Sequence, residues 1–357
     1  MGLASIASAE DVSDPFIKEV FIIGTKEQKQ TLPGSGIQIG AEELNKQSYT
    51  DLNQIVSSVP GVYVREEDGY GLRPNIGIRG ATAERSQKVT LLEDGVLIAP
   101  APYSAPAAYY ITNAARLYAV EVLKGPSAIQ SGPHTVGGTI NLITRPVPSE
   151  NFAEIDLTAG SDGYKKVAGA AGYTMENVGV LLEAFSYGSD GFKELSSGAG
   201  TGFVRNDVNL KLRWQPETTL PQIVTLKIGF ADEDADETYL GLTDADFKAQ
   251  PERRYSASQL DRFQSDHKQI HLNHSITFDT DFELVTKIYA NQYHRSWNKL
   301  DGFIDGPKIQ DVLLSPSAYL SAYRVLQGTQ DSTIGDFTDL TIDVTDNDRE
   351  YTSNGIQ

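Results

Sequence analysis

The sequence contains no cysteine, and this absence excludes three kinds of chemistry. A disulfide framework, a thiolate metal site and a cysteine nucleophile all require a residue that the chain does not have. Basic residues are scarce as well, because 30 Lys and Arg stand against 48 Asp and Glu, a formal net charge of −18. A chain with this balance has no dominant basic face to neutralise phosphates, so we do not expect nucleic acid as a partner.

Long apolar runs are also missing. A helix that crosses a membrane needs about 20 predominantly apolar residues in succession. The longest stretch of low charge, residues 96–113, is interrupted by Pro100, Pro102 and Pro106. These features argue against a helical membrane protein.

The sequence shows no legible pairing of a nucleophile with a base. Three histidines stand close together, at positions 267, 271 and 274. On a helix they would converge, but on a strand His274 points to the face opposite His267 and His271, which argues against a three-ligand zinc site. We therefore expect a protein that is not an enzyme and that holds no cofactor and no metal.

The N-terminus resembles the end of a secretory signal. Ala7, Ser8 and Ala9 precede Glu10 and fit the small-residue pattern at which such signals are cleaved. The basic part and most of the apolar part of a signal are missing from this stretch. We expect residues 1–9 to be a signal remnant on an exported protein, and an ordinary flexible N-terminus is the alternative.

Residues 10–148 predict a polar arm followed by a small α+β domain. The arm, residues 10–40, contains one apolar island, EVFIIG, which is either a buried anchor or a strand that lacks a partner. The domain, residues 41–148, begins with two predicted short helices, the second capped near Thr50 or Asp51. Pro60-Gly61 ends that helix before a strand. A second local signal, Asp94-Gly95 between two apolar runs, predicts a β-hairpin.

From residue 149 onward the sequence predicts strands. Apolar and polar residues alternate strictly in four segments, AEIDLTA (153–159), VNLKLRW (208–214), VTLKIGF (224–230) and QIHLNHSITF (269–278). Lengths of about ten residues suit tilted strands that cross a bilayer. We expect residues 149–357 to form part of an antiparallel transmembrane β-barrel, with a soluble β-sandwich as the alternative.

The predicted connections alternate in length. They are short near 175–177, 216–221 and 279–281, and long, acidic and rich in aromatics near 188–205, 232–266 and 294–349. Outer-membrane barrels have short periplasmic turns and long outer loops. We count about seven strands and the start of an eighth. Since a barrel of eight strands has no room for a domain of a hundred residues, the domain lies outside a small barrel or the chain is a fragment; we expect a fragment.

Four motifs in the first half resemble the plug domain of TonB-dependent outer-membrane receptors. They are IRG (78–80), LLEDGV (91–96), VEVLKGPSA (120–128) and GGTINLIT (137–144), and they occur in the order and spacing typical of that family. The later segment ADETYLGLTDADF (235–247) is similar to loop sequence in the branch that includes ferric-dicitrate transporters. The resemblance implies a plug inside a barrel of 22 strands.

The resemblance also implies roles for particular residues. The island Glu19, Val20, Phe21, Ile22, Ile23 and Gly24 matches the TonB box, which would add a strand to a sheet edge of TonB; pairing within the plug is the alternative. Contacts of the plug with the barrel or within the plug are expected at Arg79, Gly80, Glu93 and Asp94. An anionic ferric chelate requires Arg forks and hydroxyl donors, for which the candidates are Arg73, Arg85, Tyr103, Tyr109, Arg253 and Arg254.

The resulting hypothesis is an importer in the outer membrane of a Gram-negative bacterium. It would carry a ferric chelate such as a siderophore or ferric citrate, driven through TonB by the inner-membrane proton-motive force. We expect a monomer whose partners are TonB, the chelate and outer-membrane lipid. The alternatives are a receptor for a cobalamin or a nickel chelate, a non-transporting adhesin or phage receptor, and a truncated product without function.

Overall fold

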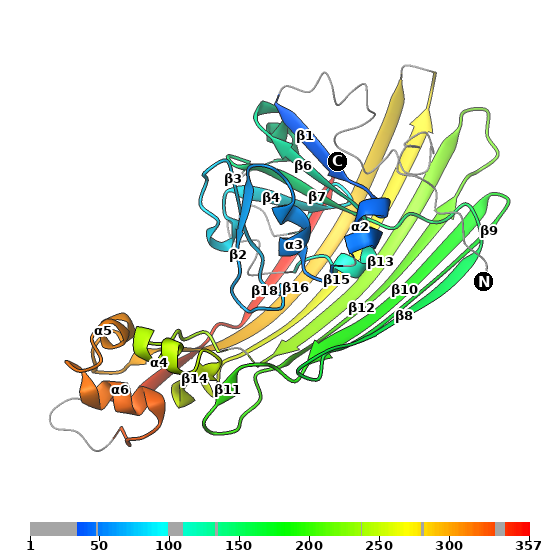
Figure 1. Cartoon of the computed structure of the whole chain (residues 1–357). Coiled ribbons are helices and arrows are strands. Elements are labelled where there is room, and N and C mark those ends of the chain that lie inside the picture. Colours follow the sequence, from blue (N-terminus) through cyan, green and yellow to red (C-terminus); the bar gives the residue numbers. More distant parts are fainter. Residues whose placement is uncertain are drawn as a thin grey trace.

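The computed structural model describes residues 34–357 except 48, 99–109, 133–134, 237, 280–281 and 333–339. Two sheets dominate it, and a small one lies against the concave face of a large curved one (Figure 1). Residues 34–148 are called the plug segment below, and the large sheet is called the wall. Among the described residues, no helix is long and apolar enough to cross a membrane.

The plug segment is built on a five-stranded sheet with the order β1-β6-β7-β4-β5. Its strands are β1 (Ser35–Ile39), β4 (Val89–Glu93), β5 (Val96–Leu97), β6 (Leu117–Lys124) and β7 (Gly138–Thr144). A separate hairpin consists of β2 (Val62–Arg65) and β3 (Asn75–Ile78), and the helical elements are α2 (Ala41–Gln47), α3 (Leu52–Ser57), η2 (Glu84–Ser86), η4 (Ala114–Arg116) and η5 (Pro126–Ser131). The mixed composition of the segment confirms the predicted α+β class.

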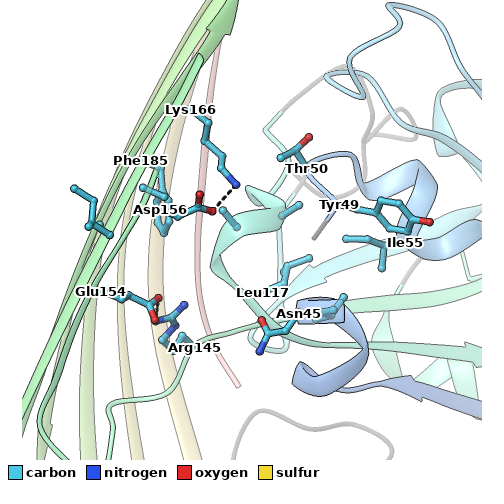
Figure 2. A pocket seen from close by; sticks show the side chains of 16 residues that line it. Asn45, Tyr49, Thr50, Ile55, Leu117, Arg145, Glu154, Asp156, Lys166 and Phe185 are labelled. Atoms are coloured by element: carbon cyan, nitrogen blue, oxygen red, sulfur yellow. Dashed lines mark hydrogen bonds and ion pairs between the residues drawn. The ribbon is translucent and has the colours of Figure 1, made fainter. Parts of the chain in front are cut away.

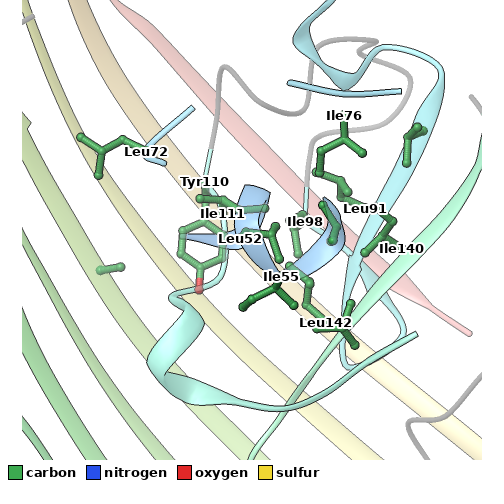
Figure 3. Close-up of a cluster of buried hydrophobic side chains, with 14 of the residues drawn as sticks. Leu52, Ile55, Leu72, Ile76, Leu91, Ile98, Tyr110, Ile111, Ile140 and Leu142 are labelled. Carbon is green, nitrogen blue, oxygen red and sulfur yellow. The ribbon is translucent and has the colours of Figure 1, made fainter. Parts of the chain in front are cut away.

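The predicted second helix is present as α3, and its start has a local cause. The Asp51 carboxylate accepts a hydrogen bond of 2.7 Å from the backbone N–H of Asn53, which satisfies one free donor of the first turn. The apolar side chains Leu52 and Ile55 are buried in the core between the helix and the sheet (Figure 3). The helix therefore fixes one side of the plug core from a capping signal that the sequence already shows.

The GGTINLIT motif forms the central strand of the plug sheet. Strand β7 pairs parallel with β4 and antiparallel with β6. A Cβ atom on Gly138 would lie 2.3 Å from the carbonyl oxygen of Leu123, and the φ angle of Gly138 is 153°. Both the close approach to β6 and the backbone conformation therefore require glycine at the start of this strand.

The wall contains nine strands joined antiparallel in the order β17-β16-β15-β13-β12-β10-β9-β8, with β18 also paired to β16. They are β8 (Phe152–Ala159), β9 (Lys165–Met175), β10 (Val178–Ser189), β12 (Phe203–Trp214), β13 (Gln222–Ala235), β15 (Arg262–Thr277), β16 (Glu283–Phe303), β17 (Ile342–Asp346) and β18 (Arg349–Ile356). Strands β17 and β18 both pair with β16 and together occupy one position at the edge of the sheet. The wall therefore has eight strand positions, in agreement with the predicted seven strands and the start of an eighth.

The sequence analysis assigned too many residues to the three long connections, which all lie at the same end of the wall. Strand β15 has 16 residues and β16 has 21, so these strands continue well beyond the apolar segments. The extensions, residues 262–266 and 294–303, mix polar, charged and aromatic side chains without regular apolar alternation, so a pattern based on that alternation predicts loop there. The actual long connections are 190–202, 236–261 and 304–341.

The two faces of the wall have the polarity of a transmembrane barrel. On β12 the side chains of Arg205, Asp207 and Lys211 face the plug segment and are buried, whereas Val208 and Trp214 on the opposite face are 45% and 52% exposed. A soluble protein buries the apolar face instead. An exposed apolar face and a polar interior are the arrangement of a barrel wall in lipid.

A second apolar cluster lies at the end of the wall that carries the long connections. It joins the connection 236–261, with α4 (Asp244–Ala249), β14 (Arg253–Arg254) and η6 (Ser256–Ser258), to the connection 304–341, with α5 (Ile309–Leu314) and α6 (Leu320–Gln327). The connection 190–202 contributes β11 (Glu194–Leu195), which pairs with β14. Figure 1 shows α4, α5 and α6 together at this end.

Candidate functional site

The plug segment meets the wall through a buried network of charges. Glu93, at the end of β4, accepts hydrogen bonds from Lys227 of β13 and, at 3.0 Å, from Gln269 of β15. Arg116 of the plug segment pairs with the same carboxylate at 3.1 Å and with Asp207 of β12 at 3.2 Å. The side chains of Glu93 and Arg116 are completely inaccessible, so the network is sealed from solvent.

The neighbouring Asp94 forms a second point of attachment. Its carboxylate lies 2.7 Å from the ammonium of Lys227 and 3.5 Å from that of Lys211, both on the wall. It also accepts hydrogen bonds from the backbone N–H and the hydroxyl of Thr144 at 2.9 and 2.7 Å, which ties the hairpin to the end of β7. The LLEDG motif thus carries two carboxylates to the inner face of the wall.

Local backbone geometry explains why the motif ends in Asp-Gly. The φ angles of Asp94 and Gly95 are 51° and 77°, as a two-residue hairpin turn with both central residues in the left-handed region requires. Asparagine, aspartate and glycine tolerate this region best. The sharp turn places the two acidic side chains next to each other and toward the wall.

The electrostatics of the network keep both carboxyl groups ionised. Burial opposes the charge on Glu93, but Lys227 and Arg116 outweigh it and hold the pKa of that carboxyl well below its usual range. Burial likewise opposes the charge on Asp94, and Lys211 with Lys227 lowers its pKa. The network is an array of paired buried charges, and separation of the plug from the wall would take Lys227 and Lys211 from the two carboxylates while Glu93 kept Arg116.

A second cluster lies where the plug segment meets the long-connection end of the wall; we call it the outer cluster. It consists of Glu67, Arg85, Tyr239, Arg295, Trp297 and Lys299. The Arg85 guanidinium lies 5.0 Å from the ring centre of Trp297 and donates a hydrogen bond of 2.9 Å to the hydroxyl of Tyr239. Arg295 lies 5.3 Å from the Trp297 ring, and Lys299 lies 5.7 Å from the Tyr239 ring. Three cations therefore surround two aromatic rings in a chain whose net charge is −18.

A cavity of about 270 Å³ separates the plug segment from the wall at β8–β10. Figure 2 shows its lining, in which the Lys166 ammonium pairs with Asp156 at 2.7 Å and Arg145 pairs with Glu154. The plug side is lined by Asn45, Tyr49 and Thr50, among others. The lining combines these polar and charged groups with apolar side chains such as Ile55, Leu117 and Phe185.

The remaining sequence-predicted residues have different positions. Arg73 is buried, with its guanidinium 2.6 Å from Glu233 of β13 and 3.7 Å from the ring centre of Phe263. Arg79 and Gly80 are exposed on the plug segment, and the backbone N–H of Arg79 donates to the carbonyl of Gly61 at 2.9 Å.

Two further candidates lie in the connection 236–261. Arg253 is 3.4 Å from Asp246, and Arg254 donates hydrogen bonds to the backbone carbonyls of its own loop. Tyr103, Tyr109 and the island 19–24 lie outside the described residues. The ligand and TonB roles of all these residues stay predictions.

The sequence analysis did not predict the wall residues of the charge network around Glu93 and Asp94, nor those of the outer cluster. Lys211 and Lys227 stand at inward positions of alternating strands, and charged residues at regular inward positions are a signal that could have found them. Tyr239 and Trp297 lie beyond the apolar alternation, where the sequence was interpreted as loop. Among the described residues, no group of three or more His, Asp or Glu side chains is placed to hold a metal ion.

Comparison with protein families gives a match for the plug segment. Residues 28–139 match the model described as "TonB-dependent Receptor Plug Domain". Among curated proteins, a vitamin B12 transporter BtuB of Vibrio vulnificus is 30% identical over 143 residues, which are 40% of this chain and 23% of that protein. The corresponding transporter of Photobacterium profundum is 28% identical over 129 residues, 36% of this chain and 20% of that protein.

Solved structures share the fold of both parts. The unliganded ferric citrate transporter FecA superimposes with a TM-score of 0.67 at 23% identity, covering 78% of this chain and 42% of that one. The ferric yersiniabactin uptake receptor FyuA from Yersinia pestis gives a TM-score of 0.64 at 18% identity, covering 77% and 43%. The chain thus spans less than half the length of these structures. Residues 28–139 thus match the plug domain of TonB-dependent receptors, and the chain shares the fold of the plug and of part of the barrel of these solved structures.

Proposed function

We propose that the protein imports a ferric chelate with acidic oxygen groups, such as ferric citrate, across the outer membrane of a Gram-negative bacterium. The observation that carries this proposal is the outer cluster, where Arg85, Arg295 and Lys299 gather around Tyr239 and Trp297. Guanidinium and ammonium groups in a partly enclosed site favour an anion, and the Tyr239 hydroxyl adds a polar group. The location at the long-connection end suits capture from outside.

We propose that the energy enters at the other end of the plug. Glu19–Gly24 would bind TonB as an added strand, and force on the arm would act on β1 and the sheet behind it. The buried charges at Glu93 and Asp94 support this assignment, because paired charges hold the plug firmly and can form again once the force ends. The protein would act as a monomer with TonB, the chelate and outer-membrane lipid as its partners.

We propose the following division of the chain. Residues 1–9 are the signal remnant, 10–40 the arm with the TonB box, 41–148 the plug and 149–357 the barrel portion. The change from mixed structure to continuous antiparallel strands between β7 and β8 supports the last boundary. The protein transports its ligand without chemical change and is not an enzyme.

A second nutrient class has a specific observation in its favour. Two curated relatives, from Vibrio vulnificus and Photobacterium profundum, are named vitamin B12 transporters. A corrinoid is larger and carries fewer anionic groups than ferric citrate, so the cations of the outer cluster favour the ferric chelate. A surface adhesin or phage receptor is the remaining alternative and requires no TonB.

The test is uptake of radio-iron by iron-starved cells that express the receptor, from a panel of chelates, with labelled cyanocobalamin as the comparison. Wild type is compared with Ile22→Pro, which removes a main-chain donor from the box. Uptake of one chelate that the proline abolishes, with surface binding retained, is the expected result. Uptake of cyanocobalamin and of no ferric chelate would identify a cobalamin as the ligand instead. Equal uptake by wild type and Ile22→Pro would contradict TonB-driven import.

A further inference from the structure

We propose that Glu67 is a specificity-determining residue that occupies Arg85 in place of the ligand and must be displaced when an anionic chelate binds. This inference rests on the proposed function. Glu67 and Arg85 both belong to the plug segment, and both side chains are mostly buried, with 21% and 18% of their surface exposed. The pair is therefore mostly buried but still in partial contact with solvent.

The ion pair with Glu67 uses only one of the two terminal nitrogens of Arg85. One oxygen of Glu67 lies 2.8 Å from Nη2 of Arg85, and the other accepts a hydrogen bond of 2.9 Å from the amide of Asn75. The second terminal nitrogen of Arg85, Nη1, is buried and has no hydrogen-bond acceptor among the described residues. A ligand carboxylate that takes both nitrogens in the parallel, two-bond geometry would bind Arg85 more strongly than Glu67 does.

A second buried donor lies at the same place. Nε1 of Trp297 has no acceptor in the described part of the chain, and the Trp297 side chain is 5% exposed. The Arg85 guanidinium is 5.0 Å from the centre of that ring. A buried donor without an acceptor costs free energy, so a ligand rich in acceptor oxygens would satisfy both groups.

The backbone around Arg85 is fixed independently of its side chain. The Arg85 N–H donates to the side-chain oxygen of Asn75 at 2.8 Å, and the Ser86 hydroxyl bridges Ile76 and Pro74 at 2.9 Å each. Arg85 and Ser86 have φ angles of 50° and 52°, a region that such residues occupy only when other contacts hold them. The guanidinium can therefore exchange one anion for another while its Cα stays in place.

The consequence is selection by charge. A neutral ligand cannot replace Glu67 on Arg85, whereas a carboxylate can, so the internal pair favours anionic chelates over neutral ones. The cost is a weaker apparent affinity, since only the fraction of molecules with Arg85 free is competent to bind. A mostly buried ion pair of this kind would reduce the affinity by about threefold to tenfold.

The experiment measures equilibrium binding of radiolabelled ferric dicitrate and of labelled cyanocobalamin to the full-length receptor in isolated outer membranes. The variants are Glu67→Gln, Arg85→Gln, the double variant, and Glu66→Gln as the control, because Glu66 is an exposed neighbour of the same charge. We expect Glu67→Gln to bind ferric dicitrate about threefold to tenfold more tightly. The control should stay within about twofold of wild type, and Arg85→Gln should bind weakly.

The double variant decides whether Glu67 acts through Arg85. The gain from Glu67→Gln should disappear when Arg85 is already glutamine, and cyanocobalamin binding should respond to neither change. Folding of every variant is checked by heat-modifiable mobility. Two results would overturn the role of Glu67 while the proposed function stands, provided that Arg85→Gln weakens dicitrate binding. In the first, a folded Glu67→Gln variant shows no gain in affinity. In the second, the gain persists when Arg85 is also replaced. If wild type binds cyanocobalamin and no ferric chelate, both the role of Glu67 and the proposed function are overturned.

Discussion

Removal of the Lys227 ammonium should loosen the plug from the wall more than any change on the outside of the barrel. In Lys227→Met the side chain keeps most of its volume but loses its contacts with Glu93 and with Asp94 at 2.7 Å. Arg116 still faces Glu93 at 3.1 Å and Lys211 faces Asp94 at 3.5 Å, so each carboxylate keeps one cation. Breaking a buried pair typically costs about 3–5 kcal/mol, and with the remaining partners we expect about 3 kcal/mol.

The assay is pulse proteolysis of the plug in outer-membrane vesicles at increasing urea, which gives the free energy of plug opening. Lys268→Met is the matched control, because Lys268 lies on the outer face and its side chain is 59% exposed. It should change that free energy by less than about 0.5 kcal/mol. In a double-mutant cycle with Glu93→Gln, the coupling between Lys227 and Glu93 should be about 2 kcal/mol. A coupling below about 0.5 kcal/mol would refute the reasoning that these charges hold the plug.

Two further predictions concern the plug helix and the lipid face. Burial raises the pKa of Asp51 to about 6, so between its unfolded value near 4 and about 6 this carboxyl binds more protons in the folded plug than in the unfolded chain, and its contribution to plug stability falls as the pH rises. Asp51→Asn keeps the helix cap and removes this contribution, so the slope of the urea midpoint of plug opening against pH should become more positive in this window than in wild type; an unchanged slope would exclude the contribution of Asp51. Val208→Arg puts a charge on the exposed apolar face and should destabilise the barrel in lipid vesicles by about 2–4 kcal/mol. Asn206→Arg, on the same face of β12 but one step closer to the long-connection end, should destabilise it less. Equal costs at the two positions would contradict the assigned lipid face.

Local signals in the sequence predicted several elements correctly. The cap at Asp51, the Asp94-Gly95 turn and the alternating segments of the wall depend on neighbouring residues and on backbone sterics, which a single sequence displays. The strand extensions were not predicted, because their polar residues lie outside the apolar belt and have no periodic signal of burial. Strand β16 therefore continues to Phe303, well into a stretch that was interpreted as loop.

The sequence alone did not identify the partners of the charged residues. Glu93 and Lys227 are separated by 134 positions, and Arg85 and Tyr239 by 154. Residue type alone indicated that Glu93 would need a partner and that Arg73 and Arg85 could bind an anion. The structure places Arg73 against Glu233 and Phe263 and Arg85 beside Trp297, a difference that no local pattern distinguishes.

By itself the sequence determined the division into a mixed plug and an alternating wall, the polarity of the two wall faces, and the turn that carries the LLEDG carboxylates. These features follow from hydrophobic periodicity and local sterics, which act over a few residues. The tertiary structure alone decided which cations receive the plug carboxylates and which aromatic rings surround Arg85. Those contacts depend on how a curved sheet brings distant strands around the plug, and the free energy of a buried charge depends on the one partner that this curvature provides.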